Sequence, residues 1–256
     1  MYGISIVITV YNEEKNIRDL LHSLILQEQP VEIIIVDSMS TDKTPEIIKQ
    51  YTNKYKFIKY YRKRSTRGEG RNYGVSLSKY DYIAFTDGDA VAHEYWIKNM
   101  RKLINKYDLI AGETLNAGNK KYSAGRLKLF YNGFEVTRPS ANLCYSKELF
   151  NKIKGFDEKF VTAEDIDLNI RAINAGARYT CCNDCLVYNK ARDNLHDFFK
   201  QAYWNGYGRG QLKAKYKDIK FGHQNELKRL FMPKYIMRNG AGLIGYLAYK
   251  LRKNKQ

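Results

Sequence analysis

Short apolar runs alternate with amphipathic stretches through the first third of the chain. The apolar runs are rich in Ile and Val and are bounded by polar residues, which predicts strands at 4–10, 31–37, 56–61 and 82–86. The stretches between them have apolar residues at helical spacing, which predicts helices at 13–27, 42–53 and 67–79. Regular alternation of this kind predicts an α/β fold, with a mostly parallel sheet that has helices on both faces.

The rest of the chain is less regular. Gly176 is a good C-terminal stop for the helical pattern before it. The predicted elements are strands at 108–114 and 140–145, a helix at 122–132, a turn at 155–158, a helix at 165–175, a strand pair near 177–188, an aromatic-rich helix at 194–213 and a helical tail within 226–256.

Polar residues follow three of the predicted parallel strands, at 9–14, 36–42 and 86–89. Ligands of parallel sheets gather at the carboxyl ends of the strands, so these segments predict a nucleotide site. Asp87 and Asp89, separated by one glycine, offer the oxygen ligands that a divalent cation needs to hold phosphates. An isolated Asp-x-Asp is more often a surface turn, but here a buried strand precedes it.

A second acidic group, Glu164-Asp165-Ile166-Asp167, opens the helix predicted at 165–175. Carboxylates are favourable at a helix N-terminus, and this alone explains such a cluster in many proteins. Together with a cation site, however, a separate carboxylate can serve as a general base. The pair of acidic sites therefore suggests an enzyme that uses a nucleotide-activated substrate.

These motifs, in their order and spacing, resemble the inverting glycosyltransferases of family 2, which have the GT-A fold. The resemblance covers about residues 3–210. It implies a glycosyltransferase domain at 1–213, with a nucleotide-sugar half at about 1–110 and an acceptor half at about 111–213, followed by a basic amphipathic tail at 214–256. The motifs that carry it are 9–14, 36–44, Gly70-Arg71-Asn72-Tyr73-Gly74, Asp87-Gly88-Asp89, Gly155-Phe156-Asp157-Glu158 and 164–168.

The resemblance implies roles for individual residues. Asp165 would be the catalytic base, and Asp87 and Asp89 would hold Mn²⁺ or Mg²⁺. Asn189 stands where relatives often have a metal-binding His, and its amide oxygen is a weaker ligand. The nucleotide would contact Val10, Tyr11, Glu13, Asp37, Gly70, Arg71 and Asp87, and the acceptor or diphosphate would contact Glu164, Gln201, Trp204 and Arg209.

The implied reaction moves a sugar from a nucleoside diphosphate, most often UDP, to a hydroxyl of a lipid-linked or growing saccharide. A polyprenyl phosphate acceptor is the alternative, although such an anion needs no base. A nucleotidyltransferase would normally have a Gly-rich, basic loop straight after its first strand, and residues 9–14 lack one. A nucleic-acid binder would use the basic and aromatic residues at 198–221 but would leave the acidic sites unexplained.

Positive charge is concentrated at the C-terminal end of the chain. The net charge is +17, and residues 190–256 carry 16 Lys or Arg against 4 Asp or Glu. The tail also places Leu243, Ile244, Leu247 and Leu251 at helical spacing, which favours a helix in an anionic membrane interface. A helix docked on the protein's own core is equally compatible with this pattern.

No run reaches the roughly 18 apolar residues of a membrane span, and an apolar strand at the start leaves no room for a signal peptide. We therefore expect a cytoplasmic protein, peripheral on the inner face of the cell membrane.

Four cysteines are present, at 144, 181, 182 and 185. Cys182 and Cys185 have the spacing of metal ligands, but neither a second such pair nor a His at a zinc-finger interval accompanies them. The sequence therefore favours four structural thiols over a zinc site or redox chemistry.

Overall fold

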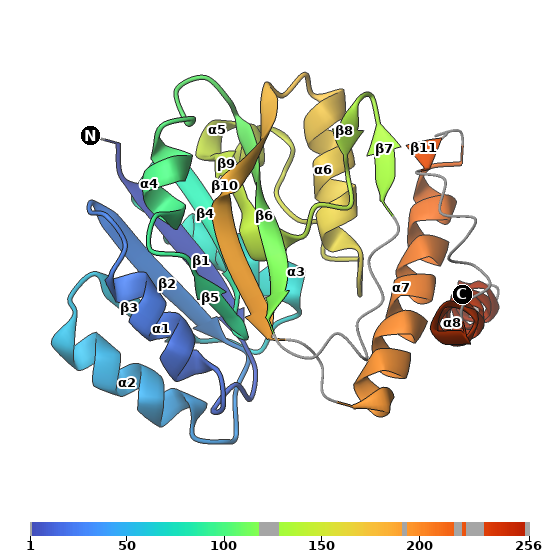
Figure 1. The fold of residues 1–256 in the computed structure, drawn as a ribbon, viewed down its shortest axis with the longest axis horizontal. Coiled ribbons are helices and arrows are strands. Elements are labelled where there is room, and N and C mark those ends of the chain that lie inside the picture. The colour runs from blue at the N-terminus through green and yellow to red at the C-terminus, as the bar shows by residue number, and fades with distance from the viewer. Residues whose placement is uncertain (1, 118–127, 191–193, 218–221, 224–232, 254–256) are drawn as a thin grey trace.

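The computed structural model describes residues 2–117, 128–190, 194–217, 222–223 and 233–253. An eight-stranded sheet with the order β3-β2-β1-β4-β9-β6-β10-β5 forms its centre (Figure 1). The strands are β1 (Ile4–Val10), β2 (Val31–Asp37), β3 (Ile58–Arg62), β4 (Tyr82–Asp87), β5 (Ala90–Ala92), β6 (Leu109–Ala117), β9 (Leu143–Ser146) and β10 (Tyr179–Lys190).

The first four strands run parallel, with β1 between β2 and β4, as the alternating pattern predicts. β9 lies antiparallel between β4 and β6, and β5 lies antiparallel at the edge beside β10. The predicted mostly parallel α/β sheet is thus confirmed. The helices of the sheet region are α1 (Ile17–Ile25), α2 (Thr44–Lys54), α3 (Arg67–Ser76), α4 (Trp96–Arg101), α5 (Lys147–Lys152) and α6 (Glu164–Asn174).

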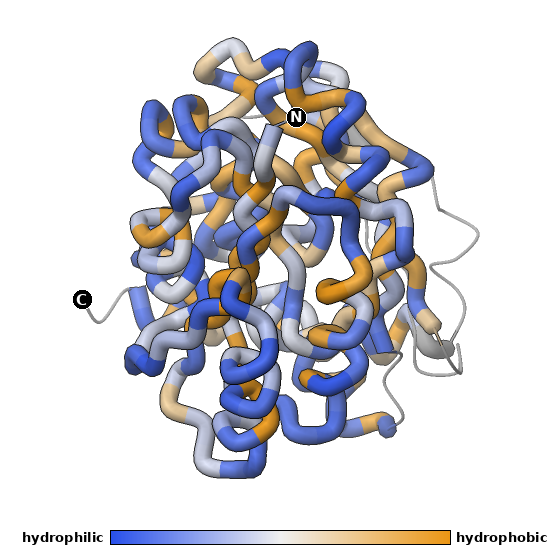
Figure 2. Tube along the Cα trace, turned by 90° about the vertical axis from the view of Figure 1, so that its left-hand side faces the viewer, coloured by the Kyte–Doolittle hydropathy of each residue, from blue (hydrophilic) through white to orange (hydrophobic). Residues whose placement is uncertain are grey.

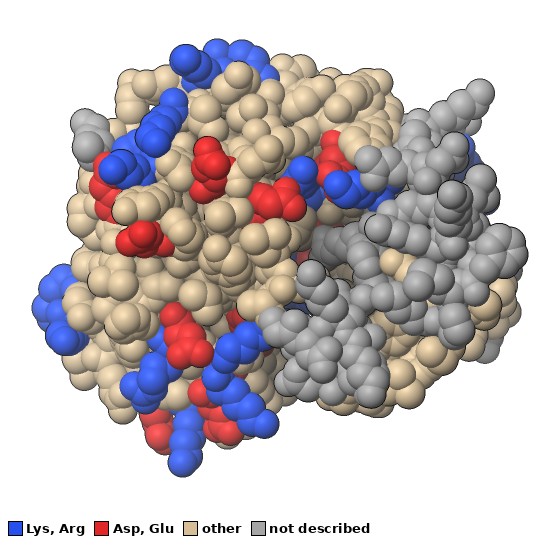
Figure 3. Space-filling view, viewed as in Figure 1, with Lys and Arg blue, Asp and Glu red and all other residues tan. Residues whose placement is uncertain are grey.

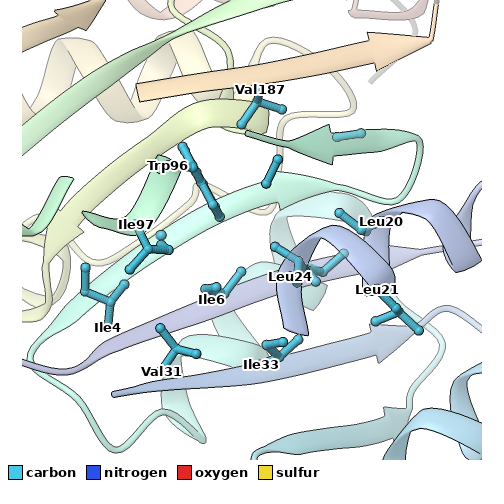
Figure 4. Close-up of a cluster of buried hydrophobic side chains, with 14 of the residues drawn as sticks. Ile4, Ile6, Leu20, Leu21, Leu24, Val31, Ile33, Trp96, Ile97 and Val187 are labelled. Atoms are coloured by element: carbon cyan, nitrogen blue, oxygen red, sulfur yellow. The ribbon is translucent and has the colours of Figure 1, made fainter. Parts of the chain in front are cut away.

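Alternate residues of β1 enter two separate hydrophobic cores. Ile4, Ile6 and Ile8 pack with α1, α2 and α4 on one face of the sheet, part of which Figure 4 shows. Val7 packs on the other face with α3, α5 and α6. Apolar segments consequently run through the middle of the molecule, and hydrophilic ones lie around them (Figure 2). Burial on both faces fixes the strand register, and so it fixes where each strand ends.

Two local predictions fail. The helix predicted at 122–132 lies partly outside the described residues, and its last part is the strand β7 (Leu129–Tyr131). β7 pairs with β8 (Phe134–Glu135) and β11 (Gly222–His223) in a small second sheet. The strand pair predicted near 177–188 is the single strand β10, whose pairing with β6 shifts register between Cys182 and Leu186.

The cysteines also differ from the prediction of four thiols. Cys182 and Cys185 form a disulfide across the register shift of β10. Cys144 is a buried thiol, and desolvation raises its pKa to about 12, whereas Cys181 is an exposed thiol.

Two long helices, α7 (Leu195–Lys215) and α8 (Pro233–Lys253), lie beside the sheet region and cross steeply, since α7 runs upright in Figure 1 while α8 is seen end-on. A Cβ on Gly206 of α7 would collide with the backbone of Gly242, and one on Gly245 would collide with Tyr203. Glycines thus allow the two backbones to touch. Among the described residues, no helix is long and apolar enough to cross a membrane.

Only one face of α8 is used in this packing. Its outer face exposes the apolar side chains of Ile236, Met237, Leu243, Ile244, Leu247 and Leu251. One side of α8 thus docks on the protein, as the second interpretation of the tail expects, and the membrane contact stays a prediction.

Candidate functional site

The polar segments after β1 and β2 are hydrogen-bonded to each other. The Asn12 N–H donates to the Ser40 Oγ (2.9 Å), and the Glu13 N–H donates to the Thr44 Oγ1 (2.8 Å). The Thr41 N–H donates in return to the Asn12 side chain (2.9 Å). Asn12 has a φ of 55°, a left-handed conformation that Asn tolerates. The predicted meeting of the strand ends is therefore present, held by hydroxyl contacts that the sequence pattern did not indicate.

Asp37, the predicted contact of the nucleotide base, is fully buried at the end of β2. Its Oδ1 accepts hydrogen bonds from the Ser40 N–H (2.8 Å) and Oγ (2.6 Å), and its Oδ2 accepts one from the Tyr60 hydroxyl (2.6 Å). Desolvation and this bond to Asp37 raise the pKa of Tyr60. The Arg62 Nε lies 3.4 Å from the same Oδ2, so protein donors already surround this carboxylate, and a base that contacts Asp37 directly has to displace one of them.

The other predicted nucleotide contacts lie around the same edge. Val10 is buried in the core, whereas Tyr11, the next residue, is 59% exposed. A Cβ on Gly70 would lie 2.8 Å from the Thr9 side chain and 3.0 Å from the Ser65 Oγ. The close contact at Gly70 is thus between α3 and the sheet edge. This contact requires a glycine whether or not a nucleotide also binds here.

Arg71 joins the two acidic motifs. It lies on α3 and is only 1% exposed, and its Nη2 is 2.8 Å from the Asp87 Oδ1 while its Nη1 is 2.9 Å from the Glu164 Oε1. Burial alone lowers the pKa of Arg71, but the charges of Asp87, Glu164 and Asp165 outweigh it, so the pKa is raised. The guanidinium therefore holds β4 and the start of α6 together.

Asp165, the predicted base, is half-buried on the first turn of α6. The Ser140 N–H lies 3.4 Å from its Oδ2. Ala163, two residues before Asp165, has a φ of 63°, which is uncommon for a residue with a Cβ and costs on the order of 1 kcal/mol. Contacts on both sides of this turn must hold it in place.

Carboxylates and one amide meet around Asp87 and Asp89. Burial raises the pKa of Glu13, a hydrogen bond from Asn16 opposes this, and the negative charges of Asp89 and Asp87 raise it further. Asn189 pairs with Ala90 across the β10–β5 ladder, directly beside Asp89. Among the described residues, no hydrogen-bond partner reaches the buried Oδ1 of Asn189.

The predicted residues of α7 lie outside the ion-paired group around Arg71. Trp204 stacks edge-on with Tyr203 and Tyr207, and Gln201 lies one turn earlier on the helix. Arg209 faces Arg238 of α8, and desolvation together with the charge of Arg238 lowers its pKa. Their predicted contacts with acceptor or diphosphate stay predictions.

Comparison with known proteins gives this arrangement its context. The mannosyltransferase PcManGT from Pyrobaculum calidifontis, solved with GDP-Man and Mn²⁺, superposes with a TM-score of 0.68 over 98% of this chain and 75% of that one, at 16% identity. S. aureus TarS 1–349, solved with UDP-GlcNAc, gives a TM-score of 0.63 over 95% of this chain and 81% of that one, at 20% identity. At these identities the likeness shows a shared fold, which is the predicted GT-A fold.

Sequence comparison identifies the family. A dolichyl N-acetyl-α-D-glucosaminyl phosphate 3-β-D-2,3-diacetamido-2,3-dideoxy-β-D-glucuronosyltransferase of Methanococcus voltae is 28% identical over 247 residues, covering 84% of this chain and 75% of the relative. The family model for glycosyl transferase family 2 matches residues 5–167, a span that contains both acidic motifs and Arg71. The chain therefore belongs to glycosyl transferase family 2 and is a glycosyltransferase.

Proposed function

We propose that this chain is an inverting glycosyltransferase that moves a sugar from a nucleoside diphosphate sugar to a hydroxyl of a lipid-linked or growing saccharide. The observation that carries the proposal is the double ion pair of Arg71. It holds an acid from the end of β4 and the acid beside Asp165 in one site, at the edge of the sheet where nucleotides bind in folds of this type.

In this proposal Asp165 is the general base. Its carboxylate accepts the proton of the acceptor hydroxyl while that oxygen bonds to the anomeric carbon of the donor. The bond from this carbon to the diphosphate breaks on the opposite face, so the configuration inverts. Glu164 stays bound to Arg71 and orients the turn that carries Asp165.

Asp87, Asp89 and Asn189 would hold a divalent cation, Mn²⁺ or Mg²⁺. The unsatisfied amide oxygen of Asn189 beside Asp89 suits such a ligand set. Among the described residues, no three acidic, His or Cys side chains form a metal site by themselves. In this proposal the donor diphosphate would supply further oxygen ligands to the cation. When bound, the cation neutralises the charge that develops on the leaving diphosphate.

A thermal-shift panel tests the donor site. We expect a nucleoside diphosphate, UDP most readily, to raise the melting temperature by several degrees in Mn²⁺, because a ligand that binds only the folded state stabilises it by mass action. The gain should shrink with EDTA and in Asn189→Ala, but persist in the matched control Asn183→Ala. An equal gain with and without metal would contradict the proposed cation, and no gain with any nucleotide would contradict the proposed donor.

The donor and acceptor classes rest on relatives. The solved neighbours hold UDP-GlcNAc and GDP-Man, so both nucleotides belong in the panel. The M. voltae relative is named for transfer to position 3 of a sugar carried on dolichyl phosphate. A sugar hydroxyl has to be deprotonated, whereas a bare polyprenyl phosphate does not, and this favours the saccharide acceptor here. Transfer to a polyprenyl phosphate with Asp165 removed would favour the alternative.

We propose further that the outer face of α8 lies against the inner face of the cell membrane. Ile236, Leu243, Ile244, Leu247 and Leu251 expose apolar surface along the helix, and Arg238, Lys250, Arg252 and Lys253 accompany them. This combination suits an interfacial helix on anionic lipid. On the face of the molecule drawn in Figure 3, by contrast, Lys and Arg side chains lie next to Asp and Glu at the end formed by α1 and α2.

Vesicle binding tests the membrane proposal. The full chain should co-sediment with vesicles that contain phosphatidylglycerol, less with phosphatidylcholine alone, and less as salt rises. The double substitution Ile244→Glu with Leu251→Glu should lower the partition coefficient at least tenfold, since both side chains are exposed and each loses apolar burial. The control Leu26→Glu changes an equally exposed side chain at the end of α1. Equal binding by the α8 variant and the control would exclude α8 as the contact.

A further inference from the structure

One face of α7 contacts the segment that leads to Asp165. A Cβ on Gly208 would lie 2.8 Å from the Ala163 Cβ and 2.9 Å from the Thr162 side chain. Gln211 and Lys215 follow at helical spacing on the same face. The segment from Asp157 to Ala163 therefore lies along α7, and it ends at the left-handed turn before Glu164.

The Gln211 amide binds the backbone of this segment at two points. Its Oε1 accepts a hydrogen bond from the Val161 N–H (3.2 Å), and its Nε2 donates to the Lys159 carbonyl (3.0 Å). A primary amide can donate from its nitrogen and accept at its oxygen at the same time. Backbone groups without regular secondary structure thereby find partners on a rigid helix.

The end of α7 binds the acids on both sides of the segment. The Lys215 Nζ is 2.7 Å from the Asp157 Oδ2 and 2.6 Å from the Asp167 Oδ1. The Tyr216 hydroxyl donates to the same Asp167 oxygen (2.6 Å). Since Asp167 is fully buried on α6, these contacts fix the helix that carries Asp165 relative to α7.

On the other side of the segment, Asn72 of α3 binds Phe156. The Phe156 N–H donates to the Asn72 Oδ1 (2.8 Å), and the Asn72 amide donates to the Phe156 carbonyl (2.9 Å). Two side-chain amides thus hold the segment, one at its start and the other close to the turn at Ala163. Only Gln211 belongs to α7, the helix that also packs on α8.

We propose that Gln211 is a positioning residue of the transfer reaction: it holds the 157–163 segment on α7 so that the turn at Ala163 presents Asp165 to the acceptor. This inference rests on the proposed role of Asp165 as base. It predicts that loss of the two Gln211 hydrogen bonds harms the chemical step, and that it leaves donor binding unchanged because Asp37 and Asp87 lie on other elements.

The test compares Gln211→Met, which keeps length and packing, with Gln211→Glu, which keeps the acceptor but loses the donor. Asn205→Ala, an exposed amide of the same helix, is the matched control. Hydrogen exchange of the 157–167 amides should speed up in Gln211→Met, less in Gln211→Glu, and stay at the wild-type rate in the control. kcat should fall about 10- to 100-fold in Gln211→Met with an unchanged KM for the donor, as expected for a misplaced catalytic group.

Unchanged exchange in Gln211→Met would overturn the inference, and so would faster exchange with the kcat of the control. A parallel rise in donor KM would also overturn it, because a general loss of structure would then be the cause. If the wild-type chain transfers no sugar, the proposed function fails separately, and the exchange rates still decide whether Gln211 holds the segment.

Discussion

Replacing Asp165 by Asn should lower kcat roughly 10²- to 10⁴-fold, the range that a general base contributes. An amide cannot accept the proton of the acceptor hydroxyl, yet it keeps the size of the side chain and leaves the Arg71 ion pairs in place. Donor affinity should stay within about twofold of wild type. The measurement is transfer kinetics from a nucleotide sugar, paired with calorimetric binding of the nucleoside diphosphate.

Asp184→Asn, a neutralisation of an exposed acid on β10, is the control for the change in charge. If Asp165→Asn turns over at the rate of this control, Asp165 is not the base. If it loses donor binding along with activity, the Glu164-Asp165 turn belongs to the donor site instead. Retained binding with lost turnover is the outcome that only a role in the chemical step predicts.

Local patterns were sufficient for the first half of the fold. The Ile- and Val-rich runs that form β1 and β2 are buried on both faces, and continuous apolar runs of this kind are typical of strands in a parallel sheet. The helix predicted at 122–132 shows where local patterns fail: Leu129–Tyr131 is a strand only because β8 and β11 pair with it. β11 lies about ninety residues away, so no local window contains the cause. The division of the chain at residues 110 and 213 stays a prediction.

The sequence motifs named several residues of the candidate site, but they did not predict which of these residues contact each other. Motif order indicated Asp87, Glu164, Asp165 and Arg71, and the resemblance put Arg71 beside a nucleotide. In the structure Arg71 joins two acids that are 16 and 93 residues away in sequence, and its contact with a nucleotide stays a prediction. Neither separation carries a periodic signal. Gln211 was missed for the same reason, since its partners are backbone groups of a loop, which no side-chain pattern reveals.

Replacing Arg71 by Met should both abolish transfer and destabilise the fold by about 3–5 kcal/mol, the usual loss when one partner of a buried ion pair is removed. Glu164 would be left as a buried carboxylate without its cation. Asp87 contributes less, because its side chain is 32% exposed and water can solvate it. Urea unfolding measures the change in the free energy of unfolding, and transfer kinetics measure the activity.

A second substitution separates these two effects. Glu164→Gln in the Arg71→Met background removes the unpaired charge, so a large part of the lost stability should return. Activity should not return, because the ion pairs of Arg71 that join Asp87 on β4 to the turn that carries Asp165 are then missing. Recovery of both would mean that Arg71 serves stability alone. If stability returns without activity, the fold is intact and only the connection made by Arg71 is missing. The guanidinium would then be needed to bring the donor side and the acceptor side of the site together.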